Sequence, residues 1–142
     1  SKSKSIIKYC NGKNGVNIIE FIKKEDLNSI DIHIVSLKKD WDHICVPSKA
    51  VSAVCGGSAI LFNCSDKNDN WKILKDAGWR IKPNNDISSQ IQKFMENLST
   101  EEIKRKKKNA LQISKKLNST KIDAFSKIFD FLIQKKYLKI SD

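Results

Sequence analysis

Apolar residues recur along the chain with two different periods, and these periods predict strands and helices in alternation. Nearly continuous apolar runs rich in β-branched residues are typical of strands buried in a parallel sheet. The run over residues 31–37 has this character most clearly. Similar runs predict further strands over residues 17–22, 59–62 and 79–82.

Apolar residues spaced three or four positions apart predict helices between and after these strands. Proline suits the first position of a helix and glycine often follows the last, so Pro47 and Gly56 bound one helix. Ser99 and Glu102 have the spacing of a capping box, which predicts the start of a basic helix. The predicted helices cover residues 24–29, 47–55 and 69–77, a segment capped by Asp86, residues 99–117, and a last segment from Thr120.

Strands that alternate with helices through short connections form parallel sheets with right-handed crossovers. The expected fold class is therefore α/β, a Rossmann-like parallel sheet with flanking helices and a helical C-terminal tail. One domain is expected over residues 1–142, with the tail over 99–142 and its apolar stripe, 125–132, facing the core. Residues 6–12 fit either the last turns of a helix or a strand.

The composition narrows the class of protein. The 142 residues are one domain's length, and 39% hydrophobic with 30% charged residues excludes a disordered chain. No apolar run reaches the length that crosses a bilayer, and the N-terminus lacks the apolar stretch of a signal peptide. We therefore expect a cytoplasmic protein.

Positive charge dominates the chain. Lysine and arginine number 27 against 16 acidic residues, a net charge of +11, and residues 101–142 hold 12 basic and 5 acidic residues. The positive electrostatic potential of such a chain favours phosphate-bearing partners: nucleotides, nucleic acid or an anionic membrane surface. The four cysteines and two histidines lack zinc-site spacing, so no metal is expected.

The most informative segment is 36–57, where a buried strand leads through a polar loop into a helix. Ligands of parallel α/β sheets collect beyond the carboxyl ends of the strands. A helix N-terminus at that edge offers free N–H groups and the positive end of a dipole, which suit a phosphate. Ser48 would add a hydroxyl and Lys49 a charge. The alternative is that Ser48 caps the helix and Lys49 is solvated.

Three runs in order, DIHIVSL from Asp31, VPSK from Val46 and VCGGSAILF from Val54, carry a family resemblance. They resemble the C-terminal, donor-binding domain of GT-B glycosyltransferases, most of all the group 1 (family 4) enzymes of bacterial capsule and lipopolysaccharide synthesis. Those enzymes have a strand ADVHLVSL, then VPSK, a helix ending AAG and a strand xPVIF. Downstream, ILKDAGWRI from Ile73 is similar to the family's LIEEAGCGLVV. The resemblance covers about residues 5–135.

The resemblance implies half of a GT-B fold, truncated at its N-terminus and lacking the N-terminal acceptor domain. The activity it implies is retaining, hexosyltransferase-like transfer from a nucleotide-diphosphate sugar to a polysaccharide or lipid-carrier acceptor in cell-surface polysaccharide biosynthesis. Neither a cofactor nor a metal is implied beyond the donor substrate. The chain alone is expected to be inactive, because the active site of such enzymes lies between two domains.

Site residues follow from the same resemblance, position by position. The base would lie against Phe21 and Ile22. Ribose would lie along the helix, where Ser52 offers a hydroxyl. The diphosphate would meet the loop and the helix start, at Val46, Pro47, Ser48 and Lys49.

Two loop residues complete the candidate set. Asp42 is placed to bind a sugar hydroxyl, and His43 to bind the diphosphate or stabilise the departing oxygen. Many family members carry two glutamates at the positions of Ile44 and Ser52, and neither position is acidic here. The catalytic residues therefore stay unassigned.

Partners follow from the missing strands and from the charge. An incomplete sheet predicts either a rearranged edge, supplied by residues 5–10, or a homodimer. The basic run 104–108 is expected to face solvent or to hold the protein peripherally at the inner face of an anionic membrane.

Two other readings stay open beside the glycosyltransferase. One is a small basic protein that binds nucleic acid or an anionic membrane without catalysis. Because no helix-turn-helix or RNP-type pattern occurs, a nucleic-acid partner is not expected. The other is a degenerate remnant without transfer activity.

Overall fold

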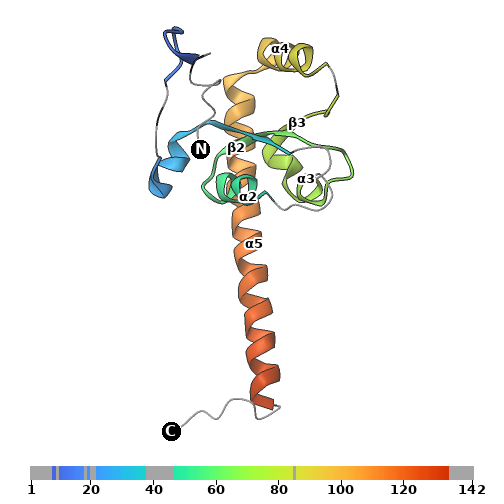
Figure 1. Cartoon of the computed structure of the whole chain (residues 1–142). Helices are drawn as coiled ribbons and strands as arrows, with labels where there is room; N and C mark the ends of the chain where they lie inside the picture. The colour runs from blue at the N-terminus through green and yellow to red at the C-terminus, as the bar shows by residue number, and fades with distance from the viewer. Residues whose placement is uncertain are drawn as a thin grey trace.

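The computed structural model describes residues 8, 10–17, 19, 22–37, 47–84 and 86–134. These residues form an α/β structure, a three-stranded parallel sheet flanked by helices and followed by one long helix (Figure 1). The long helix, α5 (Thr100–Gln134), runs past one side of the sheet and continues beyond it. The α/β class and the helical C-terminal segment expected from the sequence are confirmed.

The sheet has the strand order β1 (Ile32–Ser36), β2 (Ala59–Asn63), β3 (Gly78–Ile81), and both pairings are parallel. Helix α2 (Ser48–Cys55) connects β1 to β2. Helix α3 (Asp69–Leu74), continued by the 3-10 turn η3 (Lys75–Ala77), connects β2 to β3. Three of the four predicted strands are therefore present, each within one or two residues of its expected bounds.

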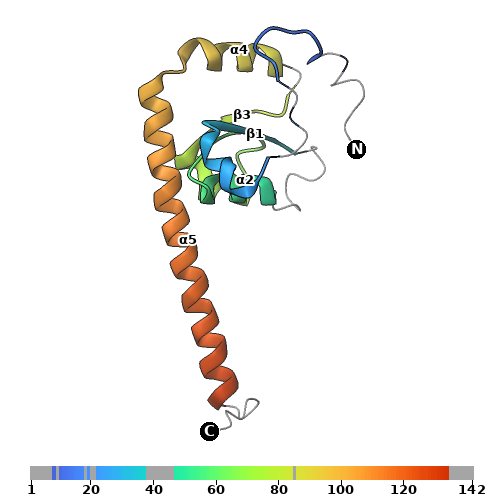
Figure 2. The ribbon, with the colours of Figure 1, turned by 90° about the vertical axis from the view of Figure 1, so that its left-hand side faces the viewer.

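The hydrophobic core lies on one face of the sheet. Central strand β2 contributes Ile60 and Phe62, both fully buried, and α5 contributes Ala110. Helices α2 and α3 cover this face (Figure 2). A salt bridge of 2.9 Å between Lys107 on α5 and Asp31 joins the long helix to the start of β1.

The opposite face of the sheet is covered only in part. Helix α4 (Ile87–Asn97) lies over it, and its Phe94 meets Trp79 of β3 edge-on at 5.2 Å. On β1 the covering is absent within the described residues, since Ile34 is 76% exposed. Ile34 pairs in register with Leu61 of β2, which is buried. On this face the sheet is therefore covered at β2 and exposed at β1.

The strand predicted over 17–22 is not found where the structure describes it. Asn17, Ile19 and Ile22 lie in no strand, while residues 18, 20 and 21 lie outside the described residues. The first element of the chain's described core is instead the 3-10 helix η1 (Lys24–Ser29), as its spacing predicts. Lys8 and Cys10 are helical, which matches the helical alternative for residues 6–12.

The two helices expected over 99–117 and from Thr120 form one helix, so the predicted break is wrong. Ser119 and Thr120 donate their hydroxyl hydrogen bonds to the carbonyl oxygen of Lys116, each at 2.9 Å. These polar side chains are thus satisfied inside the helix and do not end it. The start of the helix is as predicted, because the Glu102 amide donates to Ser99 Oγ at 3.1 Å.

The apolar stripe of 125–132 does not face the core. Phe125, Ile128 and Phe129 are all more than half exposed, on the part of α5 that extends beyond the sheet. The expectation that this stripe packs inside the domain is therefore wrong for these residues. None of the helices in the described part of the chain is long and apolar enough to cross a membrane.

Candidate functional site

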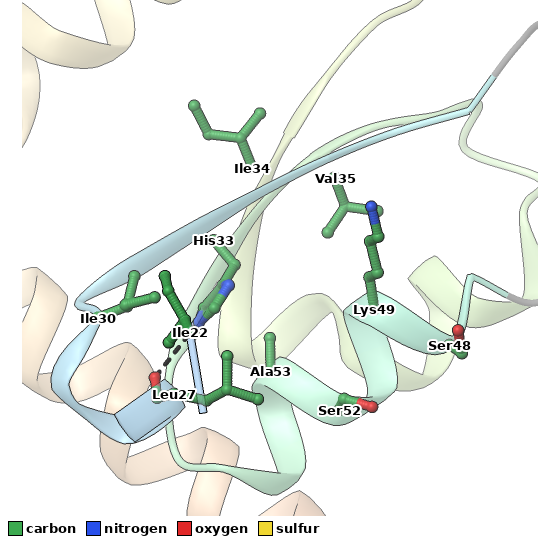
Figure 3. Close-up of a pocket in the computed structure, with 10 residues that line it drawn as sticks. All are labelled: Ile22, Leu27, Ile30, His33, Ile34, Val35, Ser48, Lys49, Ser52 and Ala53. Carbon is green, nitrogen blue, oxygen red and sulfur yellow. Dashed lines mark hydrogen bonds between the residues drawn. The ribbon is translucent and has the colours of Figure 1, made fainter. Parts of the chain in front are cut away.

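A cavity of about 310 Å³ lies between η1, β1 and α2 (Figure 3). It opens at the outer edge of the sheet, beside the strand whose second side has no neighbour in the described chain. Four of the residues predicted for a ligand site line it, Ile22, Ser48, Lys49 and Ser52. Its other lining residues are Leu27, Ile30, His33, Ile34, Val35 and Ala53.

Helix α2 begins where the sequence predicts. Pro47 is the N-cap with φ −70°, and its carbonyl oxygen accepts from the amide of Ala50 at 2.9 Å. Pro47 makes no side-chain hydrogen bond that caps this start. The amides of Ser48 and Lys49 come before the first hydrogen-bonded turn, so they have no acceptor within the helix and point toward its N-terminal end, where an anion binds favourably.

Figure 3 shows the Lys49 side chain extending from α2 toward β1, and both Lys49 and Val35 line the cavity. Lys49 and Ala53 lie one turn apart and both point at the strand. Ser48 and Ser52, also one turn apart, are exposed on a neighbouring flank of the helix. Helix α2 therefore contributes an ammonium on its side facing β1 and two hydroxyls on a neighbouring flank to the cavity lining.

The other end of the cavity is an apolar wall. Leu27 and Ile30 contribute from η1 and the residue after it, and Ile22 lies beside them. Sequence alone assigns no ligand contact to Leu27 or Ile30. An apolar wall beside a cationic rim suits a molecule with an aromatic ring at one end and phosphate at the other.

Partly buried hydrogen bonds hold η1 in place against the sheet. The carbonyl oxygen of Leu27 accepts from Ser58 Oγ at 2.9 Å, and His33 Nε2 lies 3.4 Å from the same oxygen. Ser58 is fully buried, immediately before β2. His33 is thus a partly buried residue that supports the wall, as its place in a strand predicts. Ser58 was not singled out from the sequence, and its only signal is a small polar residue between Gly57 and an apolar strand.

A second polar group lies at the same edge of the sheet. Asn63 ends β2, and its Nδ2 donates to Ser36 Oγ, at the end of β1, over 3.4 Å. Asn63 Oδ1 is buried and meets no hydrogen-bond donor among the described residues. The carboxyl edge of the sheet therefore presents an acceptor as well as the donors of α2.

The remaining predicted site residues divide into two groups. Pro47 is buried at the helix start, where it sets the course of the backbone. Phe21, Asp42, His43 and Val46 lie outside the described residues, so their predicted roles stay predictions. No carboxylate belongs to the cavity lining given above, and no cluster of three metal-ligating side chains occurs in the part of the chain that the structure describes.

Comparison with known proteins adds no relative. No family model, no curated protein and no solved structure matches this chain. A functional assignment therefore depends on the residues of the cavity and on the resemblance of the motifs around it.

Proposed function

We propose that this chain is the donor-binding part of a GT-B glycosyltransferase and binds a nucleotide-diphosphate sugar in the cavity beside α2. The observation that supports the proposal most is the position of Lys49. Its side chain extends from the first turn of α2 toward a parallel strand, in a cavity whose other end is an apolar wall. A nucleotide diphosphate needs an apolar surface for its base and positively charged groups for its phosphates, at the carboxyl edge of a parallel sheet.

Each part of the donor has a counterpart. The diphosphate binds the Lys49 ammonium and the first amides of α2, where charge-assisted hydrogen bonds are strong. The base packs on Ile22, Leu27 and Ile30, and Ser52 hydrogen-bonds the ribose. From the motif resemblance, Phe21 and Val46 extend the base and phosphate contacts, and Asp42 and His43 approach the sugar and the leaving phosphate.

The reaction proposed is transfer of the sugar, with retained configuration, to a polysaccharide or lipid-carrier acceptor of the cell surface. The donor-binding residues gather on one edge of the sheet, so an acceptor must approach from another body. We therefore expect nucleotide binding without transfer from the chain by itself, and transfer only when an acceptor domain completes the cleft.

Calorimetry with UDP, GDP and their sugar conjugates tests donor binding. Hydrogen bonds to a charged group contribute about 1.5–3 kcal/mol, so Lys49→Ala is expected to raise Kd by about 10–100-fold. Lys67→Ala is the matched control, because Lys67 is an exposed lysine in the turn before α3, away from the cavity lining. Absence of binding at millimolar nucleotide, or equal losses in both variants, would refute the proposal.

A second candidate function is binding to a polyanion or an anionic membrane without catalysis. It is favoured by the exposure of Lys104, Arg105 and Lys108 on α5, within a chain of net charge +11. Binding of this kind weakens steeply with salt and does not distinguish one nucleotide from another. Titration with heparin and with UDP at two salt concentrations therefore separates the two functions.

A further inference from the structure

The part of α5 beyond the sheet carries an apolar surface that the rest of the fold does not use. We now use the word tail for residues 118–134 alone, the distal part of the C-terminal segment expected over 99–142. Residues 24–37, 47–84 and 86–117 are the α/β body. In Figures 1 and 2 the tail leaves the α/β body as a straight helix, and at 1.5 Å per residue it extends about 25 Å. Residues 121–131 are all exposed, with Ile122 at 68%.

This apolar surface continues the face by which α5 already packs. Ala110 is fully buried against the body, and Ser114 donates to the carbonyl oxygen of Cys55 at 3.3 Å. Eighteen residues are five full turns of an α-helix, so Ile128 and Leu132 lie on the same side as Ala110 and Ser114. The apolar surface of the tail therefore begins on the side of α5 that faces the body and continues around the helix to Phe129 and Ile122, about 100–120° away.

The spacing of the tail's apolar residues fits a second copy of itself. Ile122, Phe125, Phe129 and Leu132 follow one another at intervals of three, four and three, the spacing of a coiled-coil seam. When the two helices run antiparallel, the seam of one copy is complementary to the same seam of the other. Ile122 meets Leu132 of the second copy, Phe125 meets its Phe129, and a twofold axis repeats both contacts.

Charge favours the same arrangement. The tail holds Lys121 and Lys127 against Asp123 and Asp130, so its net charge is zero while the whole chain carries +11. Two tails can therefore pack without net repulsion. An antiparallel pair also keeps the basic residues 104–108 of the two copies at opposite ends, whereas a parallel pair would bring them together.

The length of the tail suits this register. The end of the second copy's helix reaches the level of Thr120, where the tail leaves the body. The two tails therefore overlap over their whole length, and neither helix runs into the α/β body of the other copy.

We propose that two copies of this chain associate through antiparallel packing of their tails. The four seam side chains each bury roughly 100 Å² on packing, giving about 400 Å² per copy, the size of a weak, transient interface. The expected dimer is therefore weak. It uses a different surface from the open edge of β1.

Sedimentation of the full chain from about 5 to 200 µM tests the proposal. A monomer–dimer equilibrium is expected, and the double variant Phe125→Ser with Phe129→Ser should stay monomeric throughout. Asp123→Ser with Lys127→Ser, on the polar side of the same tail, is the control and should leave the equilibrium unchanged. Because Phe125 and Phe129 are exposed in the single chain, circular dichroism and nucleotide binding should match the original chain for both variants.

Small-angle X-ray scattering of the dimer tests its orientation. Antiparallel tails give an elongated particle with the two α/β bodies at its ends, and bodies side by side would overturn the arrangement. A chain that stays monomeric at 200 µM, or a dimer that persists in the phenylalanine double variant, would overturn the proposal. A monomer whose tail binds vesicles of phosphatidylglycerol and phosphatidylcholine would assign the apolar face to a membrane instead.

Discussion

Gly78 is where two strands of the sheet come closest together. A Cβ built on Gly78 would lie 2.2 Å from the carbonyl oxygen of Ile60 on β2. The backbone there is ordinary and extended, with φ −162°, so the requirement is for space and not for conformation. A residue with any side chain must push β3 away from the central strand.

Gly78→Ala is therefore expected to lower the free energy of unfolding by about 1–3 kcal/mol or more, the range found for overpacked cores. Urea unfolding measures it. Gly12→Ala is the control, since it has a positive φ of +74° but nothing within 4 Å of its Cβ. Gly12→Ala should lower the free energy of unfolding by only about 1 kcal/mol. Equal losses in the two variants would contradict the close approach seen at Gly78.

Lys106 is the described residue whose proton affinity is most changed by the fold. Partial burial lowers the pKa of its amine below 10.5, and neighbouring Arg105 lowers it further, while Glu102 and Asp76 oppose the shift. The amine donates to the carbonyl oxygen of Lys75 at 3.3 Å and lies 5.6 Å from the centre of the Trp79 ring. The folded chain therefore holds this proton less tightly than the unfolded chain.

The sign of the pH dependence follows from that difference. Between the lowered pKa and 10.5 the unfolded state binds more protons, so stability rises with pH across this window. The free energy of unfolding of the original chain should increase relative to Lys106→Met as the pH is raised from 7 toward 10.5. Urea titrations of both proteins at several pH values measure it, and parallel curves would show that the amine is not perturbed.

Among the elements, two helices begin in different ways although both have a favourable residue at the N-cap. Asn68 Oδ1 accepts from the amide of Trp71 at 3.0 Å at the start of α3. Asp86 has no such bond at the start of α4, where the sequence predicts one, because its backbone is not in the extended conformation of a usual N-cap. There the Asp86 amide donates to Asn84 Oδ1 at 3.1 Å.

Asn68→Ala is therefore expected to lower the free energy of unfolding by about 1 kcal/mol, and Asp86→Ala by a few tenths. Differential scanning calorimetry of the two variants gives the comparison. A larger loss from Asp86→Ala would mean that the carboxylate caps α4 in solution after all.

The elements show what a sequence pattern can and cannot predict. Apolar runs and their flanking prolines and glycines gave β1, β2 and α2 closely, because these signals act over a few neighbouring residues. The same kind of pattern gave Phe125 and Phe129 a place in the core, where they are exposed. Periodicity shows that a helix face is apolar, but what covers that face depends on residues far away in the chain.

The candidate site shows the same difference between residues with local sequence signals and residues positioned by distant contacts. Ser48 and Lys49 were predicted because a strand end and a helix start are both local signals, and the structure places them at one edge of the sheet. The apolar wall depends on Ser58, which fixes the carbonyl oxygen of Leu27 from 31 residues away. Contacts at such a separation leave no local pattern, so Leu27 and Ile30 receive no ligand contact from sequence alone, whereas the family resemblance assigns Ile22.

At the scale of the whole molecule, the site joins the edge strand to the rest of the fold. Within the described residues β1 pairs with β2 alone, and its Ile34 is exposed on the face opposite α2. The cavity brings η1, β1 and α2 to one ligand, so a bound donor would hold together the least supported part of the sheet. Binding should therefore be visible in the stability of the entire α/β structure.

A nucleotide sugar at ten times its Kd should add about 1.4 kcal/mol to the free energy of unfolding. For a chain of this size that raises Tm by about 5 °C. Lys49→Ala should lose the increase at the same nucleotide concentration, whereas Lys67→Ala should keep it. Inorganic pyrophosphate, which lacks the base, should raise Tm by less, because it leaves Ile22, Leu27 and Ile30 uncovered. If pyrophosphate or heparin raises Tm as much as the nucleotide sugar does, and moderate salt removes the effect, then the positive field of the whole chain is responsible and not the cavity.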